Sequence, residues 1–321
     1  MVSIVLPCYN VANTIGETLQ SIVNQLHEDF EVIAINDGSQ DSTLDILKLW
    51  AQNDSRIKVY SQSNRGVSSA RNNALDRCSG EFICFVDADD LIEPDYLVRL
   101  LELMTSGASM DLAICGFTKD MRLSSNIHIS FKSYQIDNAE FINKTILRKG
   151  FNPQIWCMLF RSDIIHRNNI HFEVGCTRGE DREFFMKYVI YARGIIYTMK
   201  PLYHYRVSAS SAMSTLNEKS LTSIEASWRT YLYYNEHKPL LANVVLMSYY
   251  ATIWKFVILC KMRKNVQLVS IVQERYNVRD AICNLRYHPN IMWRLSSYLY
   301  IISPYLFDRL CYIAGFFTNK R

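Results

Sequence analysis

The first 120 residues alternate short apolar runs with amphipathic stretches, and this alternation restricts the fold more than any other feature of the sequence. The apolar runs cover residues 2–6, 30–35, 57–60 and 82–86. Between them, apolar side chains recur at helical spacing, as from Ile15 to Leu26. The run Phe82–Val86 is continuously apolar, which is typical of a parallel strand buried on both faces. The pattern predicts an α/β fold with a mostly parallel sheet flanked by helices.

The pattern changes further along the chain. Glu140–Leu147 and Arg182–Tyr191 have helical spacing, and Gly194–Met199 is predicted to be a strand. Beyond residue 215, turn residues become scarce and aromatic-rich helical sequence takes over. We therefore predict an α/β domain over residues 1–215 and a helical C-terminal region over residues 216–321.

Cysteine usage and charge bear on location. The nine cysteines form no Cys-x-x-Cys pair, which disfavours a zinc knuckle or a disulfide framework and suits a reducing cytosol. The chain enters a strand directly after Met1 rather than a signal peptide, so we expect a cytoplasmic protein. Residues 218–321 hold 14 Lys and Arg against 6 Asp and Glu, whereas the rest holds 21 against 25. Such a basic region suits an anionic membrane surface or nucleic acid; a solvated basic surface is the alternative.

Polar side chains gather where the predicted strands end. The first strand ends in Pro7-Cys8-Tyr9-Asn10, the second in Asn36-Asp37-Gly38-Ser39, and the fourth in Asp87-Ala88-Asp89-Asp90. Ligands of open α/β sheets bind at the carboxyl ends of strands. Three adjacent carboxylates repel one another, and a divalent cation such as Mg²⁺ or Mn²⁺ relieves that repulsion. The last segment therefore predicts a metal–diphosphate site; a turn that caps the next helix is the alternative.

These segments, together with Asn64-x-Gly66-x-x-x-Ala70-Arg71-Asn72, resemble glycosyltransferase family 2, which has the GT-A fold. The absence of Gly-x-Gly-x-x-Gly after the first strand argues against a dinucleotide-binding dehydrogenase. The resemblance implies a pocket for the nucleotide base, usually uracil, formed by Pro7, Tyr9 and Asp37. It implies contacts to ribose and diphosphate from Asn10, Arg71 and Asp87. It also implies that Asp89 ligates the metal. Taken singly, an arginine such as Arg71 is more often part of a helix-surface ion pair, and a tyrosine such as Tyr9 more often packs in the core.

The segment Arg178-Gly179-Glu180-Asp181 is similar to the Glu-Asp motif that opens a helix in this family. An inverting transfer needs a base to take the proton of the attacking acceptor hydroxyl. By resemblance, Asp181 is that base and Glu180 orients a substrate. The alternative is that Asp181 only caps the helix, where a carboxylate is favoured in any case.

Tyr203-His204-Tyr205-Arg206, followed by Ser210-Ser211, is similar to the family segment that closes over the diphosphate. Arg206 can offer a forked cation to phosphate oxygens. His204 is a candidate metal ligand, with a packed or exposed histidine as the alternative.

Two nearby positions concern the substrates. Trp156 is a candidate wall for the acceptor sugar, with core packing as the alternative. Met158 stands where many family members carry lysine, and this is a departure from the family pattern.

In the C-terminal region, Leu240–Cys260 is apolar but contains Lys255, which argues against a membrane-spanning helix. Trp293–Phe317 mixes aromatic side chains with Arg294 and Arg309, a pattern typical of a helix lying in the membrane interface. The alternative is a helical module that packs on protein.

We therefore predict an inverting, metal-dependent hexosyltransferase that uses a UDP-sugar and Mn²⁺ or Mg²⁺. Resemblance to bacterial members implies an acceptor hydroxyl on a surface glycan, such as lipopolysaccharide, O-antigen or capsule, and no nucleic-acid partner. This interpretation fits a cytoplasmic enzyme that lies peripherally on the inner membrane. A homo-oligomer is compatible with it. Nucleotidyl transfer is disfavoured because no Gly-rich, Lys-containing loop follows the first strand. A catalytically silent partner that binds glycan or membrane remains the alternative.

Overall fold

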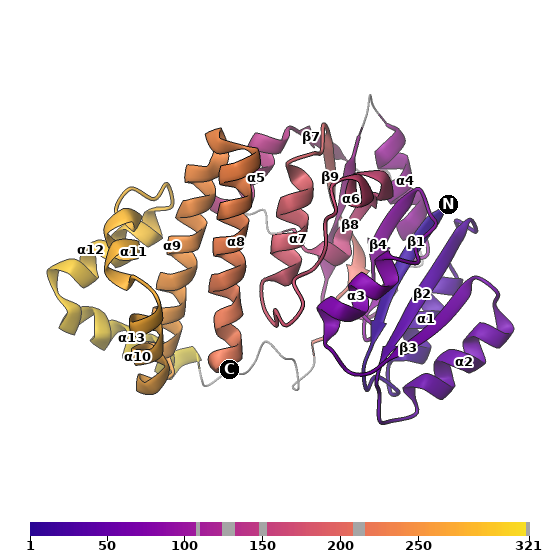
Figure 1. The fold of residues 1–321 in the computed structure, drawn as a ribbon, viewed down its shortest axis with the longest axis horizontal. Coiled ribbons are helices and arrows are strands. Elements are labelled where there is room, and N and C mark those ends of the chain that lie inside the picture. Colours follow the sequence, from indigo (N-terminus) through magenta and orange to yellow (C-terminus); the bar gives the residue numbers. More distant parts are fainter. Residues whose placement is uncertain (107–109, 124–131, 148–152, 208–215, 319–321) are drawn as a thin grey trace. The chain divides into compact units, whose positions relative to one another are not determined.

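The computed structural model describes residues 1–106, 110–123, 132–147, 153–207 and 216–318. The chain forms two compact units, one of residues 1–141 and 151–211 and one of residues 142–150 and 212–321 (Figure 1). The predicted division at residue 215 falls within 208–215, outside the described residues.

The first unit is built on a sheet with strand order β3-β2-β1-β4-β8-β6-β9-β5. Its N-terminal half is parallel, as predicted, and consists of β1 (Val2–Cys8), β2 (Phe30–Asp37), β3 (Ile57–Gln62) and β4 (Phe82–Phe85). The second half is mixed and consists of β5 (Leu91–Ile92), β6 (Leu112–Thr118), β8 (Met158–Arg161) and β9 (Ile195–His204), with β7 (Ser133–Ile136) paired to β9. Here β8 lies antiparallel between β4 and β6. The predicted α/β fold is confirmed, and the antiparallel insertion is a feature that the sequence pattern did not show.

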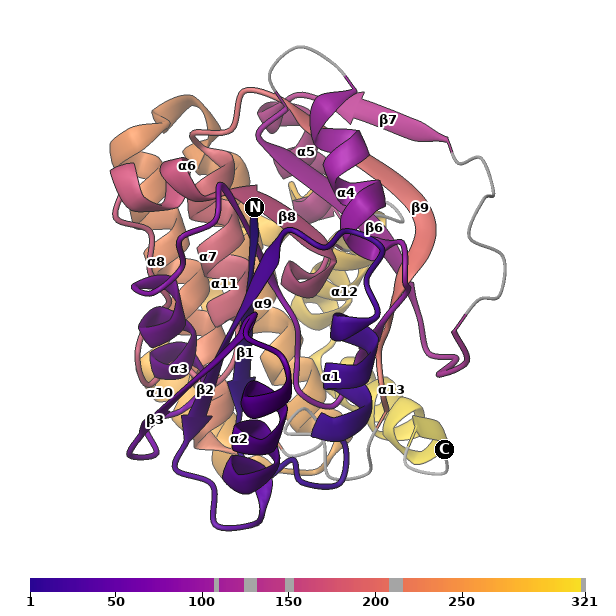
Figure 2. The ribbon, with the colours of Figure 1, turned by 90° about the vertical axis from the view of Figure 1, so that its right-hand side faces the viewer.

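Helices cover both faces of the parallel strands. α1 (Ile15–Val23) and α2 (Thr43–Asn53) lie on one face, whereas α3 (Val67–Leu75) packs against β1 and β2 from the other (Figure 2). This division follows from right-handed crossovers in a sheet whose strand order reverses after β3. The remaining helices are α4 (Tyr96–Thr105), α5 (Asn138–Leu147), the short η1 (Ile155–Cys157), α6 (Ser162–Arg167) and α7 (Glu180–Val189).

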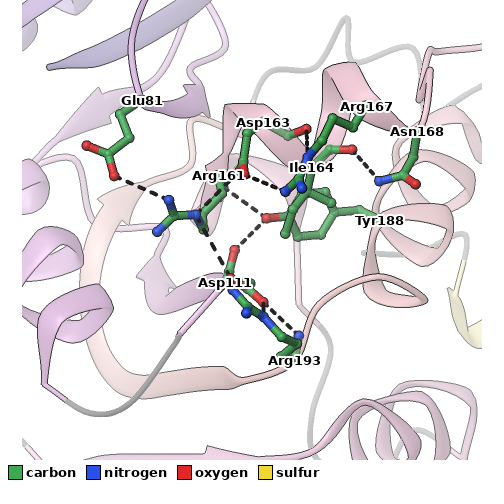
Figure 3. Close-up of polar contacts among 9 residues, drawn as sticks. All are labelled: Glu81, Asp111, Arg161, Asp163, Ile164, Arg167, Asn168, Tyr188 and Arg193. Carbon is green, nitrogen blue, oxygen red and sulfur yellow. Dashed lines mark hydrogen bonds and ion pairs between the residues drawn. The ribbon is translucent and has the colours of Figure 1, made fainter.

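A buried polar network anchors the C-terminal end of α7 (Figure 3). The Tyr188 hydroxyl donates to the carbonyl of Asp111 and accepts from the backbone N–H of Arg161 at 2.9 Å. The Asp111 carboxylate, which is fully buried, pairs with the guanidinium of Arg193 at 3.1 Å. A buried polar group without a partner is costly, so this mutual satisfaction fixes α7 against β6 and β8. The helix that carries Glu180 and Asp181 at its start is thus held at its end.

The second unit is helical. It contains η2 (Glu218–Leu221), α8 (Thr222–His237), α9 (Pro239–Met262), α10 (Val266–Arg275), α11 (Val278–Leu285), α12 (Ile291–Ile302) and α13 (Pro304–Thr318). α9 contacts α8, α10, α11 and α13, and its Trp254 stacks on Phe307 with ring centroids 4.9 Å apart. Within the described ranges, α9 is the one helix with the length and apolar composition to cross a membrane. The same properties suit a core helix, and Trp254, Val257 and Cys260 are buried in this unit.

Candidate active site

The acidic turn after β4 is held in place by α1, because the hydroxyls of Thr14 and Thr18 both donate to the carbonyl of Ala88. Its three carboxylates have different surroundings. Asp87 pairs with Arg71 at 3.1 Å, while buried Asp90 accepts from the Tyr203 hydroxyl at 2.8 Å and the Arg206 backbone N–H at 2.7 Å. Burial and the charge of Asp87 raise the pKa of Asp90 to about 8. The sequence predicted mutual repulsion among these three carboxylates. Contacts with Arg71, Tyr203 and the Arg206 backbone relieve part of it.

Asp89 differs from Asp87 because its carboxylate forms no ion pair with any residue that the structure describes, and it differs from Asp90 because it accepts no hydrogen bond from Tyr203 or from the Arg206 backbone N–H. Burial and the nearby charge of Asp87 raise its pKa, which reflects a carboxylate without a counter-ion in contact. Among the described residues, no three His, Cys, Asp or Glu side chains gather into a complete metal site. One available carboxylate does suit Mg²⁺ or Mn²⁺ bound together with substrate phosphates, because such ions use only one or two protein carboxylates.

Arg71 joins the acidic turn to the start of α7. The side chain is buried, with 3% of the residue exposed. Its guanidinium contacts Asp181 at 2.5 Å, Asp87 at 3.1 Å and Glu180 at 3.7 Å. Burial lowers the pKa of Arg71, but the three carboxylates outweigh burial and hold it above its ordinary value. Arg71 is therefore a buried cation shared by three candidate site residues, and the alternative of a helix-surface ion pair is wrong.

Glu180 and Asp181 open α7 directly after Gly179, which has the left-handed φ of +89°. Burial, together with repulsion from Asp181, raises the pKa of Glu180 to about 7. Burial also raises the pKa of Asp181, although Arg71 opposes this. A third of the Asp181 side chain is exposed, so a substrate hydroxyl can reach it. The pair thus combines an accessible carboxylate with a neighbour that is half-protonated near neutral pH.

A cavity of about 310 Å³ lies at the carboxyl ends of β1 and β2, lined by Pro7, Tyr9, Asp37, Asn64, Gly66 and Val67. Tyr9 is 46% exposed, so it is not a core residue. The two carboxylate oxygens of Asp37 accept from the backbone N–H groups of Arg65 and Gly66 at 2.9 and 2.8 Å. Asp37 therefore fixes the loop that forms one wall of the cavity, a role that the motif alone did not indicate.

Asn10 follows Tyr9 of this cavity in the chain, but its polar groups form hydrogen bonds with other residues of the protein. It has a left-handed φ of +52°, which asparagine tolerates better than most residues. Its side-chain oxygen accepts from the backbone N–H of Gln40 at 2.8 Å, and its own N–H donates to the Ser39 hydroxyl. Asn10 thus joins the loop after β1 to the loop after β2.

The structure contradicts the prediction that His204 is a metal ligand. Its Nε2 lies 2.8 Å from the Glu93 carboxylate, and its Nδ1 contacts the carbonyl of Asp120. Burial lowers the pKa of His204, but these two contacts outweigh burial and raise it. With both ring nitrogens engaged, no lone pair is available to a metal.

Arg206 does lie at the acidic turn. Its Nε donates to the Asp89 carbonyl at 2.7 Å, and its terminal nitrogen pairs with Glu17 at 2.5 Å. The predicted Ser210 and Ser211 lie outside the described residues.

Trp156 and Met158 are both core residues. Trp156 is buried and stacks on Tyr203 and Tyr205, with ring centroids 4.4 and 5.6 Å away. The core-packing alternative therefore describes it, and it does not form a wall toward solvent. Met158 is fully buried in β8, so the departure from lysine lies inside the sheet.

Two positioning residues were not assigned from the sequence. Asn72 clamps the segment before α7, because its side-chain amide donates to the Phe172 carbonyl and accepts from the Phe172 N–H, both at 2.8 Å. The Tyr203 hydroxyl accepts from the Asp87 N–H at 3.1 Å while it donates to Asp90. Both residues stood in recognised motifs, but only their distant partners reveal the roles.

A sheet of this order, with a cavity and carboxylates at the carboxyl ends of its parallel strands, defines a GT-A-like α/β protein. Residues 3–188 match glycosyl transferase family 2. The chain belongs to this family.

The chain is also similar to individual proteins. It is 33% identical over 236 residues to the putative glycosyltransferase EpsH of Bacillus subtilis, covering 71% of this chain and 67% of EpsH. The crystal structure of S. aureus TarS 1–349 in complex with UDP-GlcNAc matches with a TM-score of 0.62 and 23% identity, covering 74% of this chain and 67% of TarS 1–349. The mannosyltransferase PcManGT of Pyrobaculum calidifontis, in complex with GDP-Man and Mn²⁺, matches with a TM-score of 0.56 and 15% identity, covering 99% of this chain and 86% of PcManGT. These likenesses between structures support the shared fold.

Proposed function

We propose that this protein is an inverting glycosyltransferase that moves a hexose from a UDP-sugar to a hydroxyl of a glycan acceptor. The observation that carries the proposal is the position of Arg71, which brings Asp87 from the sheet and Asp181 from α7 to one buried cation. Donor and acceptor sites must meet at the anomeric carbon, and here a nucleotide-side carboxylate and a candidate base converge.

Asp89 is the residue that would hold Mn²⁺ or Mg²⁺, since its carboxylate has no ion pair among the described residues. When bound, the ion neutralises charge that develops on the leaving diphosphate. Arg206 lies against the same turn through the Asp89 carbonyl, and phosphate oxygens can replace Glu17 as its partner.

The chemistry falls to Asp181. Its carboxylate takes the proton of the acceptor hydroxyl while that oxygen forms a bond to the anomeric carbon. The bond from that carbon to the diphosphate oxygen breaks, and the nucleoside diphosphate leaves with the electron pair. Attack from the face opposite the leaving group inverts the configuration. Arg71 stabilises the ionised form of Asp181, while Glu180, with a pKa of about 7, can share a hydrogen bond with a substrate hydroxyl.

We also propose that the acceptor belongs to a bacterial surface glycan carried on lipid, and that the protein works at the cytoplasmic face of the membrane. Support comes from the basic second unit, with 14 Lys and Arg against 6 Asp and Glu over residues 218–321. A basic surface is attracted to anionic lipid, where such an acceptor would be found.

The test is a donor screen with purified protein, Mn²⁺ and a panel of UDP-, GDP- and dTDP-sugars, following thermal stability and nucleotide release with and without EDTA. We expect one UDP-sugar to stabilise the protein in a metal-dependent way. Asp89→Asn should abolish this stabilisation. Asp181→Asn should retain it while nucleotide release falls about 10²- to 10⁴-fold.

Asp163→Asn, a change at a half-exposed carboxylate of α6, is the matched control and should bind nucleotide sugar and release nucleotide as wild type does. If the folded protein responds to no nucleotide sugar, the transferase proposal fails and a catalytically silent binding partner takes its place.

A further inference from the structure

A cavity of about 590 Å³ lies within the second unit, and none of the residues assigned above lines it. One wall is a face of α11, where Arg279, Ile282 and Arg286 follow one another at helical spacing. The opposite wall comes from the end of α12 and the start of α13, with Tyr300, Ile301 and Pro304. Two arginines two turns apart therefore face an apolar and aromatic wall.

The cavity is cationic. Among the residues that the structure describes, no acidic side chain lines it. Arg279 is exposed and forms no ion pair with any residue in the described part of the chain. Arg286 donates from Nε to the Cys283 carbonyl at 3.0 Å and lies over the Tyr287 ring, and it too forms no ion pair with a described residue. Unneutralised guanidinium groups beside apolar side chains suit a ligand with an anionic head and an apolar body.

An exposed apolar face continues from the cavity along α12 and α13. On α12 it consists of Ile291, Met292, Leu295, Tyr298, Ile301 and Ile302, each at least 45% exposed. Arg294 is the one charged residue of this helix. On α13 the face continues with Tyr305, Leu306, Leu310, Tyr312 and Ile313. An apolar face of this extent marks an interaction surface, and Ile301 belongs to both the face and the cavity wall.

The net positive charge of the second unit indicates which kind of partner this apolar face would bind. The basic excess of residues 218–321 complements an anionic bilayer, and tyrosines among aliphatic side chains suit the boundary between headgroups and acyl chains. We propose that the cavity binds the phosphate of an anionic phospholipid between Arg279 and Arg286, with the exposed face of α12 and α13 in the acyl boundary. This inference deepens the membrane location proposed above and rests on it.

The experiment is flotation of the full chain with vesicles of phosphatidylcholine, alone or mixed with an equal part of phosphatidylglycerol. We expect tight binding to the anionic vesicles only. Arg279→Gln/Arg286→Gln should weaken it about 30-fold, as expected for two basic side chains at the surface. The control is Lys238→Glu, which makes the same change in net charge at the start of α9. This position lies about 36 Å from Met262 at the other end of that helix. The control should weaken binding less than about threefold.

Several outcomes would overturn the inference. These are equal losses for the double variant and Lys238→Glu, binding to phosphatidylcholine alone that ignores the arginines, or competition by inorganic phosphate at low millimolar concentration. Light scattering that shows a stable dimer broken by Leu295→Gln would assign the face to a second copy instead. Nucleotide release from a UDP-sugar in solution should be unchanged in all these variants, so a failure here is distinguishable from failure of the proposed transferase activity.

Discussion

Replacement of Glu180 by glutamine should stabilise the protein at alkaline pH. Glu180 is largely buried at the start of α7, beside Asp181 and 3.7 Å from Arg71. Burial and the charge of Asp181 raise its pKa from 4.5 to about 7, so these effects outweigh the attraction to Arg71. Glutamine keeps the shape and removes the charge.

The direction and the size of this change in the free energy of unfolding follow from the difference between the pKa of Glu180 in the folded and unfolded states. A carboxyl group with a raised pKa binds its proton more tightly in the folded state, so the contribution of Glu180 to stability is full below pH 4.5 and is lost as pH rises from 4.5 through 7. At about 1.4 kcal/mol per pKa unit, the ionised group costs about 3 kcal/mol at pH 8, of which about 2 kcal/mol accrues above pH 5.5. Glu180→Gln should recover most of this at pH 8 and much less at pH 5.5.

The assay is urea unfolding of wild type and variant at pH 5.5 and pH 8. Glu102→Gln is the control, because it removes a half-exposed carboxylate that pairs with Arg99 on the surface of α4. It should cost less than about 1 kcal/mol, equally at both pH values. If Glu180→Gln is no more stable than wild type at pH 8, or its advantage is the same at pH 5.5, then Glu180 is not a destabilised carboxylate and this account of the site is wrong.

Three further changes test other parts of the first unit. Arg71→Met should lower the free energy of unfolding by about 3–5 kcal/mol at pH 8, because it leaves carboxylates without their buried cation, and urea unfolding should show a smaller loss at pH 5.5. Tyr188→Phe should cost about 1–3 kcal/mol in the same assay while nucleotide binding stays unchanged; weakened binding would contradict a purely anchoring role. Gly38→Ala should weaken nucleotide binding about tenfold in a titration. The φ of +71° at this position is strained for alanine, and the new Cβ would lie 2.8 Å from the backbone nitrogen of Asn64. Normal affinity would show that this loop is no part of the pocket.

The parallel half of the first unit was predictable because each strand is a separate apolar run and each helix has a clear amphipathic period. β8 was not, because three apolar residues followed by Arg161 carry no signal for the partner or direction of a strand. Its neighbours β4 and β6 are chosen by packing between segments far apart in the chain.

The candidate site, like the fold, was predictable from the sequence only in part. Asp87, Asp89 and Asp181 could be proposed as site residues because their motifs lie within a few residues, and the structure brings Asp87 and Asp181 together on Arg71. His204 was assigned wrongly because its partner Glu93 lies 111 residues away, where no local pattern reveals it. Motifs thus indicate which residues gather at a site, whereas hydrogen bonding over long separations decides which of them keep a free lone pair.

The pairing of Arg71 with Asp181 also bears on how the protein is made. The two residues are separated by 110 positions. A ribosome adds about 5–20 residues per second, so about 5–20 s pass between synthesis of Arg71 and synthesis of Asp181. During that interval α3 holds a cation that belongs in the interior, and the Asn72 clamp still lacks its partner Phe172. The parallel strands can therefore form early, but the candidate site is completed only when α7 arrives, and a chain interrupted before residue 180 has Asp87 as the partner of Arg71 but lacks Glu180 and Asp181.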